Sequence, residues 1–162
     1  MAASRARAGI RPFAKLRLVM VAPALAILFA RAGAQSLPVI DAAPDFRVVS
    51  GSGLVMERAS IRGRLVLLFH ETQERQYDNM KLKRELKDAK LLDGEVANFL
   101  VLAVADCSSF PAIFRPAIEL GMRTKSKEYG LEIYGDWDGA MARDFGLKRG
   151  ASNVLLVEPS GR

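Results

Sequence analysis

Two pairs of polar residues carry the side chains best suited to chemistry in this sequence. His70 and Glu71 follow one apolar run, and Asp106 and Cys107 follow the next. Imidazole, thiolate and carboxylate groups are ligands for zinc or softer metals, and a thiol beside an imidazole is typical of nucleophilic or redox catalysis. The spacing matches no recognised metal signature, and a lone cysteine is more often a small buried residue. The sequence therefore predicts no metal and no cofactor, with Cys107 and His70 as the alternative catalytic pair.

Alternating strands and helices are predicted to position these residues. The apolar runs Arg64 to Phe69 and Phe99 to Ala105 lack polar alternation, which is typical of strands buried on both faces. A helix between them, over Gln76 to Leu92, would make them parallel with a right-handed crossover. The other predicted elements are a hairpin from Phe46–Val49 and Leu54–Glu57, a helix within Phe114–Tyr129, a strand over Leu131–Asp136, a short helix over Gly139–Leu147 and a strand from Asn153. This order predicts a three-layer α/β domain.

The first 34 residues have the pattern of a secretory signal peptide. Basic residues precede the apolar run Leu18 to Ala30, and Ala32-Gly33-Ala34 supplies a small-residue site with cleavage expected before Gln35. The run spans only about 20 Å as a helix, less than the ~30 Å hydrocarbon core of a membrane. We therefore expect residues 1–34 to be removed, residues 35–162 to form one domain, and the product to be periplasmic or secreted, touching the membrane only through the leader.

The charge distribution excludes a nucleic-acid partner. The leader holds six of the 24 basic residues and no acidic one, which leaves 18 basic residues against 18 acidic ones from Gln35 onward. The net charge of +6 therefore belongs to the leader and not to a binding surface. Cys107 is the single cysteine, so no disulfide within the chain is possible.

Four stretches resemble the thioredoxin-like superfamily in its exported redoxin, or peroxiredoxin-related, branch. They are APDF from Ala43, ASIRGRLVLLFH from Ala59, WDGAMARDFGLK from Trp137 and NVLLVEPSGR from Asn153. The resemblance covers Pro44 to Arg162. It implies a three-layer thioredoxin-like sandwich with a central mixed sheet, and a bacterial origin. Because the sequence stops inside the expected closing hairpin, either its last strand has an unpaired edge or the sequence is a fragment.

The departures from this family concern its redox centre. In redox-active members a Cys or Cys-x-x-Cys pair lies at the start of the helix after the central strand, where the helix dipole stabilises thiolate. Here ETQERQYD, Glu71 to Asp78, occupies that place, and the family's cis-proline position falls near Ser152. No catalytic residue is therefore carried over from the family. We expect a recognition loop there instead, made of Glu71, Gln73, Glu74, Arg75 and Ser152.

Two functions follow from these observations. The first is an exported thioredoxin-fold protein with a degenerate active site, which acts as a binding or assembly module of the bacterial cell envelope for a protein or peptide partner. The alternative is a thiol-dependent oxidoreductase or antioxidant protein of the redoxin type that uses Cys107. The sequence leaves open whether the protein is an enzyme, because fold alone does not decide it.

Overall fold

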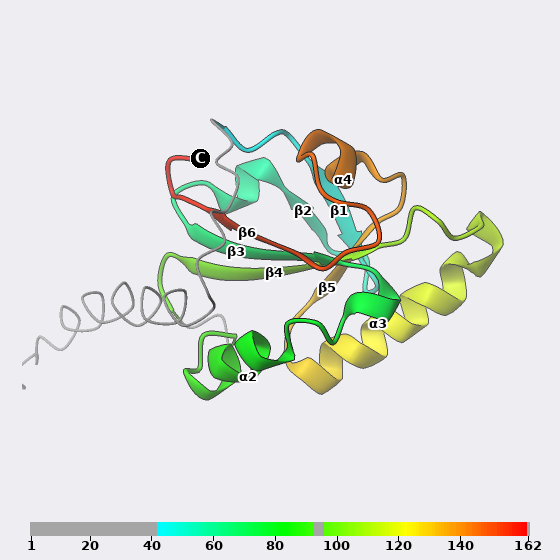
Figure 1. The fold of residues 1–162 in the computed structure, drawn as a ribbon, viewed down its shortest axis with the longest axis horizontal. Helices are drawn as coiled ribbons and strands as arrows, with labels where there is room; N and C mark the ends of the chain where they lie inside the picture. The colour runs from blue at the N-terminus through cyan, green and yellow to red at the C-terminus, as the bar shows by residue number, and fades with distance from the viewer. Residues whose placement is uncertain (1–41, 93–95, 162) are drawn as a thin grey trace, which may run out of the picture. The chain divides into compact units, whose positions relative to one another are not determined.

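A six-stranded mixed sheet forms the centre of the molecule. The computed structural model describes residues 42–92 and 96–161, and the sheet has the order β2-β1-β5-β4-β3-β6 (Figure 1). Strand β4 pairs in parallel with β3 and with β5, whereas the other neighbours are antiparallel. The strands are β1 Arg47–Ser50, β2 Val55–Glu57, β3 Leu65–Glu71, β4 Phe99–Asp106, β5 Ile133–Asp136 and β6 Asn153–Val157. The predicted hairpin and the parallel pair of apolar strands are confirmed.

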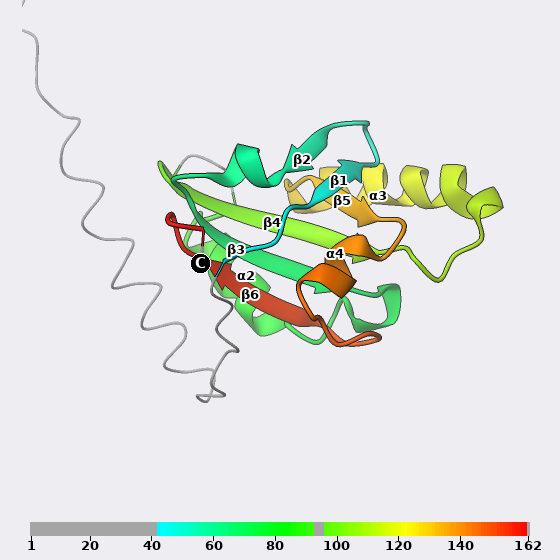
Figure 2. The ribbon, with the colours of Figure 1, turned by 90° about the horizontal axis from the view of Figure 1, so that it is seen from above.

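Helices cover both faces of this sheet. The helices α2, Met80–Asp88, and α3, Arg115–Tyr129, lie on one face, and α4, Ala140–Asp144, lies on the other (Figures 1 and 2). Helix α3 carries Pro116 in its first turn, where the missing N–H costs little, and ends at Gly130 with a left-handed φ of 66°. Short 3₁₀ helices complete the set: η1 Arg58–Ile61, η2 Gln73–Arg75 and η3 Ala112–Phe114. The three-layer α/β prediction is confirmed.

The main core lies between the sheet and α4. Val66 and Leu68 on β3 are completely buried there, beside Leu102 on β4 and Met141 on α4. Burying each side chain of this size contributes roughly 1.5–3 kcal/mol. Because residues at alternate positions of a strand share a face, this core also fixes which way the polar residues at the strand ends point.

The β1–β2 turn anchors α3 to the sheet. A side chain at Gly51 would place its first carbon 2.6 Å from the backbone oxygen of Glu119, so only glycine allows this close approach. Arg123 on α3 donates a hydrogen bond of 2.7 Å from its guanidinium to the Gly51 backbone oxygen. The position of α3 over the sheet is therefore set by the hairpin as well as by its own apolar contacts.

The predicted helix over Gln76 to Leu92 is longer than the helix that forms. Helix α2 begins only at Met80 and ends at Asp88, and η2 with turns occupies Gln73 to Asn79. Two side chains that would otherwise face solvent are engaged with backbone and loop atoms: Lys83 bonds the Gln76 backbone oxygen at 2.7 Å, and Asn79 bonds Ser152. These contacts hold the segment before Met80 in a non-helical path.

The signal-peptide prediction lies outside the described residues, as does its cleavage site. Among residues 42–92 and 96–161, no helix combines the length and apolar character needed to cross a bilayer.

Candidate functional site at the carboxyl ends of the central strands

Glu71, the last residue of β3, is the centre of a polar network. Its carboxylate accepts one hydrogen bond from Ser152 Oγ and an ion-paired bond of 2.5 Å from Lys83 Nζ. Ser152 Oγ in turn accepts a bond of 2.6 Å from the Asn79 side-chain amide. The network joins the end of β3, the start of α2 and the loop before β6. Glu71 is the first residue of the segment that the family resemblance places at the redox centre, and Ser152 lies near the family's cis-proline position, so a carboxylate–hydroxyl hydrogen bond joins these two regions.

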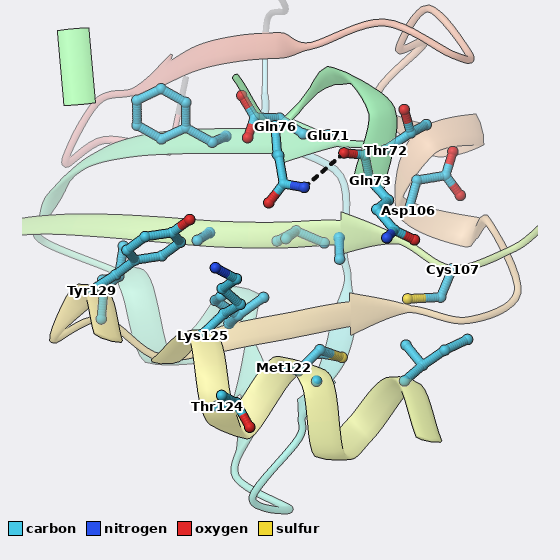
Figure 3. A pocket seen from close by; sticks show the side chains of 18 of the residues that line it. Glu71, Thr72, Gln73, Gln76, Asp106, Cys107, Met122, Thr124, Lys125 and Tyr129 are labelled. Carbon is cyan, nitrogen blue, oxygen red and sulfur yellow. Dashed lines mark hydrogen bonds between the residues drawn. The ribbon is translucent and has the colours of Figure 1, made fainter. Parts of the chain in front are cut away.

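The five residues of the predicted recognition loop fall into two groups. Gln73, Glu74 and Arg75 in η2 are exposed, whereas Glu71 is 9% exposed and Ser152 is half-buried. The η2 turn is also held from within by a bond of 2.9 Å from the Gln76 side-chain amide to the Gln73 backbone oxygen (Figure 3). The exposed group faces solvent, and the buried group joins the end of β3 to the loop before β6.

His70 points to the opposite face of the sheet from Glu71. Its Nε2 lies 3.2 Å from Asp136 Oδ2, and both residues are 2% exposed. The same carboxylate accepts backbone N–H bonds from Met141 at 3.3 Å and from Ala142 at 2.9 Å. Asp136 therefore connects β3, β5 and the first turn of α4, and sequence reasoning missed this role.

The pKa of Asp136 lies below its usual value of 3.8. Burial acts to raise it, but the hydrogen bonds from His70, Ala142 and Met141 outweigh burial because they stabilise the ionised form. Since the folded-state pKa is depressed, the carboxylate stabilises the fold above the usual pKa. That contribution is lost as the pH falls through the lower, folded-state value.

We expect acid to weaken the protein partly through this carboxylate. The free energy of unfolding of the wild type should fall as the pH drops below the usual carboxyl pKa of 3.8, and Asp136→Asn should show a shallower fall. Urea titrations at successive pH values from neutrality through the carboxyl range measure both slopes. Equal slopes for the two proteins would contradict this assignment.

Cys107 lies at the end of β4 and is 2% exposed. Burial raises the pKa of its thiol to about 12, and the nearby Asp106 and Asp136 carboxylates add to this effect, against a smaller opposing effect of Arg115. Its N–H bonds the Asp136 backbone oxygen at 3.0 Å. A thiol in this environment stays protonated at neutral pH, whereas reactive cysteines are partly exposed and electropositive in their surroundings.

The structure separates His70 from the other three candidate residues, Glu71, Asp106 and Cys107, which line one groove. His70 pairs with Asp136 on the α4 face, while Glu71 and Cys107 line the opposite face. Asp106 accepts bonds from the backbone N–H and the hydroxyl of Ser108 in a local turn. Among the described residues no three His, Cys, Asp or Glu side chains form a group suited to a metal ion.

A large groove opens on the face that carries α2 and α3. It has a volume of about 1150 Å³. The lining residues from the three central strands β3, β4 and β5 form its floor and include Phe69, Val101, Ala103, Ala105 and Ile133. Sequence reasoning missed it. The available signal was the pair of alanines in an otherwise bulky strand, because small side chains leave space above a sheet.

A scan against protein-family models finds no match, and a comparison with curated proteins finds none either. Solved structures do match. A thiol-disulfide oxidoreductase from Bacteroides fragilis NCTC 9343 superimposes with a TM-score of 0.54 at 21% identity, over 75% of this chain and 86% of that one. The fold is thioredoxin-like.

Two further solved structures share this thioredoxin-like fold. A thiol:disulfide interchange protein of the thioredoxin family from Chlorobium tepidum TLS matches at a TM-score of 0.54 and 16% identity, over 80% of this chain and 84% of that one. A secreted Mycobacterium tuberculosis disulfide oxidoreductase, described as homologous to E. coli DsbE, matches at a TM-score of 0.51 and 14% identity, over 72% of this chain and 78% of that one. With a single cysteine, this thioredoxin-like chain has no Cys-x-x-Cys. Identities this low establish the fold and not the activity.

Proposed function

We propose that this protein is an exported thioredoxin-fold binding module of the bacterial cell envelope, which recognises a protein or peptide partner without dithiol–disulfide exchange. The observation that carries the proposal is the replacement of the redox centre by the Glu71 network. At the end of the central strand a carboxylate is held by Lys83 and Ser152. Disulfide exchange needs a thiolate at that place, and no oxygen or nitrogen group performs it.

The exposed side chains beside this network supply the recognition surface. Gln73, Glu74 and Arg75 provide an amide, an acid and a base on a turn. Its backbone is held by bonds from the Gln76 side chain to the Gln73 oxygen and from the Arg75 N–H to the Thr72 oxygen. A pre-organised loop binds with a smaller entropic cost than a loose one. Export is supported by the leader pattern of residues 1–34. One protein of the same fold is also described as secreted.

Site-specific crosslinking tests the recognition loop. The full chain carrying a photoreactive phenylalanine analogue at Gln73 is expressed in the organism that holds this sequence, and the matched control carries it at Ala59, an exposed residue of η1. We expect a discrete crosslinked adduct from position 73 that is absent from position 59. Export is tested separately, because the amino-terminal sequence of the exported protein should begin at Gln35. Identical crosslinking patterns from the two positions would overturn the assignment of the loop.

The thiol-dependent alternative has a separate test. Insulin-reduction and peroxide-consumption assays on the wild type and on Cys107→Ser distinguish a binding module from an oxidoreductase. We expect neither activity above background. An activity that the Cys107→Ser substitution abolishes would establish the alternative function instead.

A further inference from the structure

The groove between α2 and α3 exposes the middle of the sheet. Ala103 and Ala105 lie on β4, which is paired on both sides by β3 and β5, yet both alanines remain partly exposed. Helix α2 forms one wall with Met80, and α3 forms the other with Ala117 and Ile118. The volume of about 1150 Å³ slightly exceeds the roughly 300–1,000 Å³ of common small-molecule sites. The groove therefore has room for a sizeable ligand.

The floor of the groove suits an alkyl chain better than an extended peptide. Its side chains, Phe69, Val101, Ala103, Ala105 and Ile133, carry no polar atom. The backbone groups of β4 are already bonded to β3 and β5, so a peptide strand lying on this floor would leave its own N–H and C=O groups unsatisfied. An alkyl chain has no such groups, and its burial is favourable in proportion to area.

The α2 rim of the groove is cationic. Lys83, Arg84 and Lys87 line it, and Lys83 is already paired with Glu71. Arg84 and Lys87 are exposed, and no carboxylate of residues 42–92 and 96–161 pairs with either of them. These two cations are complementary to an acidic head group placed at the end of an apolar chain.

An exposed apolar cluster adjoins the groove at the start of α3. Phe110, Ile113 and Phe114 are 36%, 82% and 54% exposed, and Phe110 and Phe114 also line the groove. Exposed apolar side chains that continue into a groove are typical of a ligand entrance. The cluster gives an apolar chain a continuous path from solvent to the floor.

We propose that this groove binds a long-chain carboxylic acid, with the alkyl chain on the alanine floor and the carboxylate beside Arg84 and Lys87. The proposal goes beyond the partner recognition assigned to the Gln73 loop: Gln73 lines the same groove, but the contacts proposed here are made by the floor and by α2. Fatty-acid binding and crosslinking at Gln73 therefore measure different contacts, and either can fail without the other.

Parinaric acid, a fluorescent long-chain fatty acid, tests the proposal with protein made from the full 162-residue chain. We expect saturable binding, weakened at least about tenfold by Ala103→Trp, which fills the floor. Ala117→Trp, in the α3 wall of the groove, should act in the same way if the first variant folds poorly. The matched control is Ala59→Trp, an exposed alanine outside the groove, which should bind as the wild type does.

Charge reversal tests the head-group contact. Arg84→Glu should weaken the binding of parinaric acid on the order of fivefold. It should leave the binding of parinaryl alcohol unchanged, because the alcohol carries no charge. Lys81→Glu, on α2 but outside the groove, is the control and should change neither.

Four results would overturn the proposal. They are no binding of parinaric acid by the wild type, equal binding by Ala103→Trp and Ala59→Trp, and capture of an amphipathic Leu- and Glu-containing helical peptide in place of the fatty acid. The fourth is a wild-type dimer that Ala103→Trp dissociates, which would make a second copy of this chain the occupant.

Discussion

Replacing Asp136 with alanine is expected to lower the free energy of unfolding by about 3–5 kcal/mol, because it leaves three buried hydrogen-bond donors without their acceptor, at roughly 1–3 kcal/mol each. The carboxylate holds His70 at 3.2 Å and accepts the backbone N–H groups of Met141 and Ala142. All three donors would lose their partner, in a region where His70 is 2% exposed. Urea unfolding followed by circular dichroism at neutral pH measures the loss.

A neighbouring aspartate provides the matched control. Asp138 accepts the N–H of Ala140 at 3.0 Å but is exposed, so Asp138→Ala should cost about 1 kcal/mol. His70→Leu in the Asp136→Ala background should recover part of the loss, because it removes the unsatisfied imidazole. Equal losses for Asp136→Ala and Asp138→Ala would show that the pair has no special role in the fold.

The Cys107 thiol is expected to be almost unreactive in the folded protein. A thiol with a pKa of about 12 carries about a thousandfold less thiolate at neutral pH than one at the ordinary value of 9.0. Burial is the main cause, and it also blocks approach of a reagent. A chromogenic disulfide reagent should therefore modify the folded protein at least about a hundredfold more slowly than the same chain unfolded in urea.

An exposed cysteine on the same turn calibrates this measurement. The double variant Cys107→Ser/Ser109→Cys moves the sulfur two positions along, to an exposed site, and should react at the rate of a small-molecule thiol. If Cys107 in the folded wild type matches that rate, the thiol is accessible and the oxidoreductase alternative regains its basis.

Apolar periodicity predicted the scaffold because burial on both faces leaves a clear pattern. The runs that became β3 and β4 were predicted, and so was the helix within Phe114–Tyr129 that became α3. The ends of α2 were not predicted correctly from this pattern. Its start is set by Lys83, which bonds Gln76 and Glu71 outside the helix, and by Asn79, which bonds Ser152 far away in the sequence. Apolar periodicity does not record such polar contacts.

The candidate site was predicted less well than the scaffold, for a geometric reason. Strand ends do converge, but adjacent residues on one strand point to opposite faces. His70 and Glu71 therefore had to separate, one to Asp136 and the other to Lys83. The partner of His70 lies on β5, two strands away, and the order of strands in a sheet is not written in the sequence of either strand.

The late start of α2 at Met80 also limits what protein engineering can restore. A cysteine grafted at Glu71 would sit at a strand end with no α-helix beginning beside it, since Gln73 to Asn79 follow as a 3₁₀ helix and turns. It would receive no stabilisation from a helix dipole. It would also release Lys83 and Ser152 from their present acceptor. Turning this scaffold into a reductase therefore requires rebuilding the backbone from Gln73 to Asn79. A single substitution of Glu71 with cysteine is not sufficient.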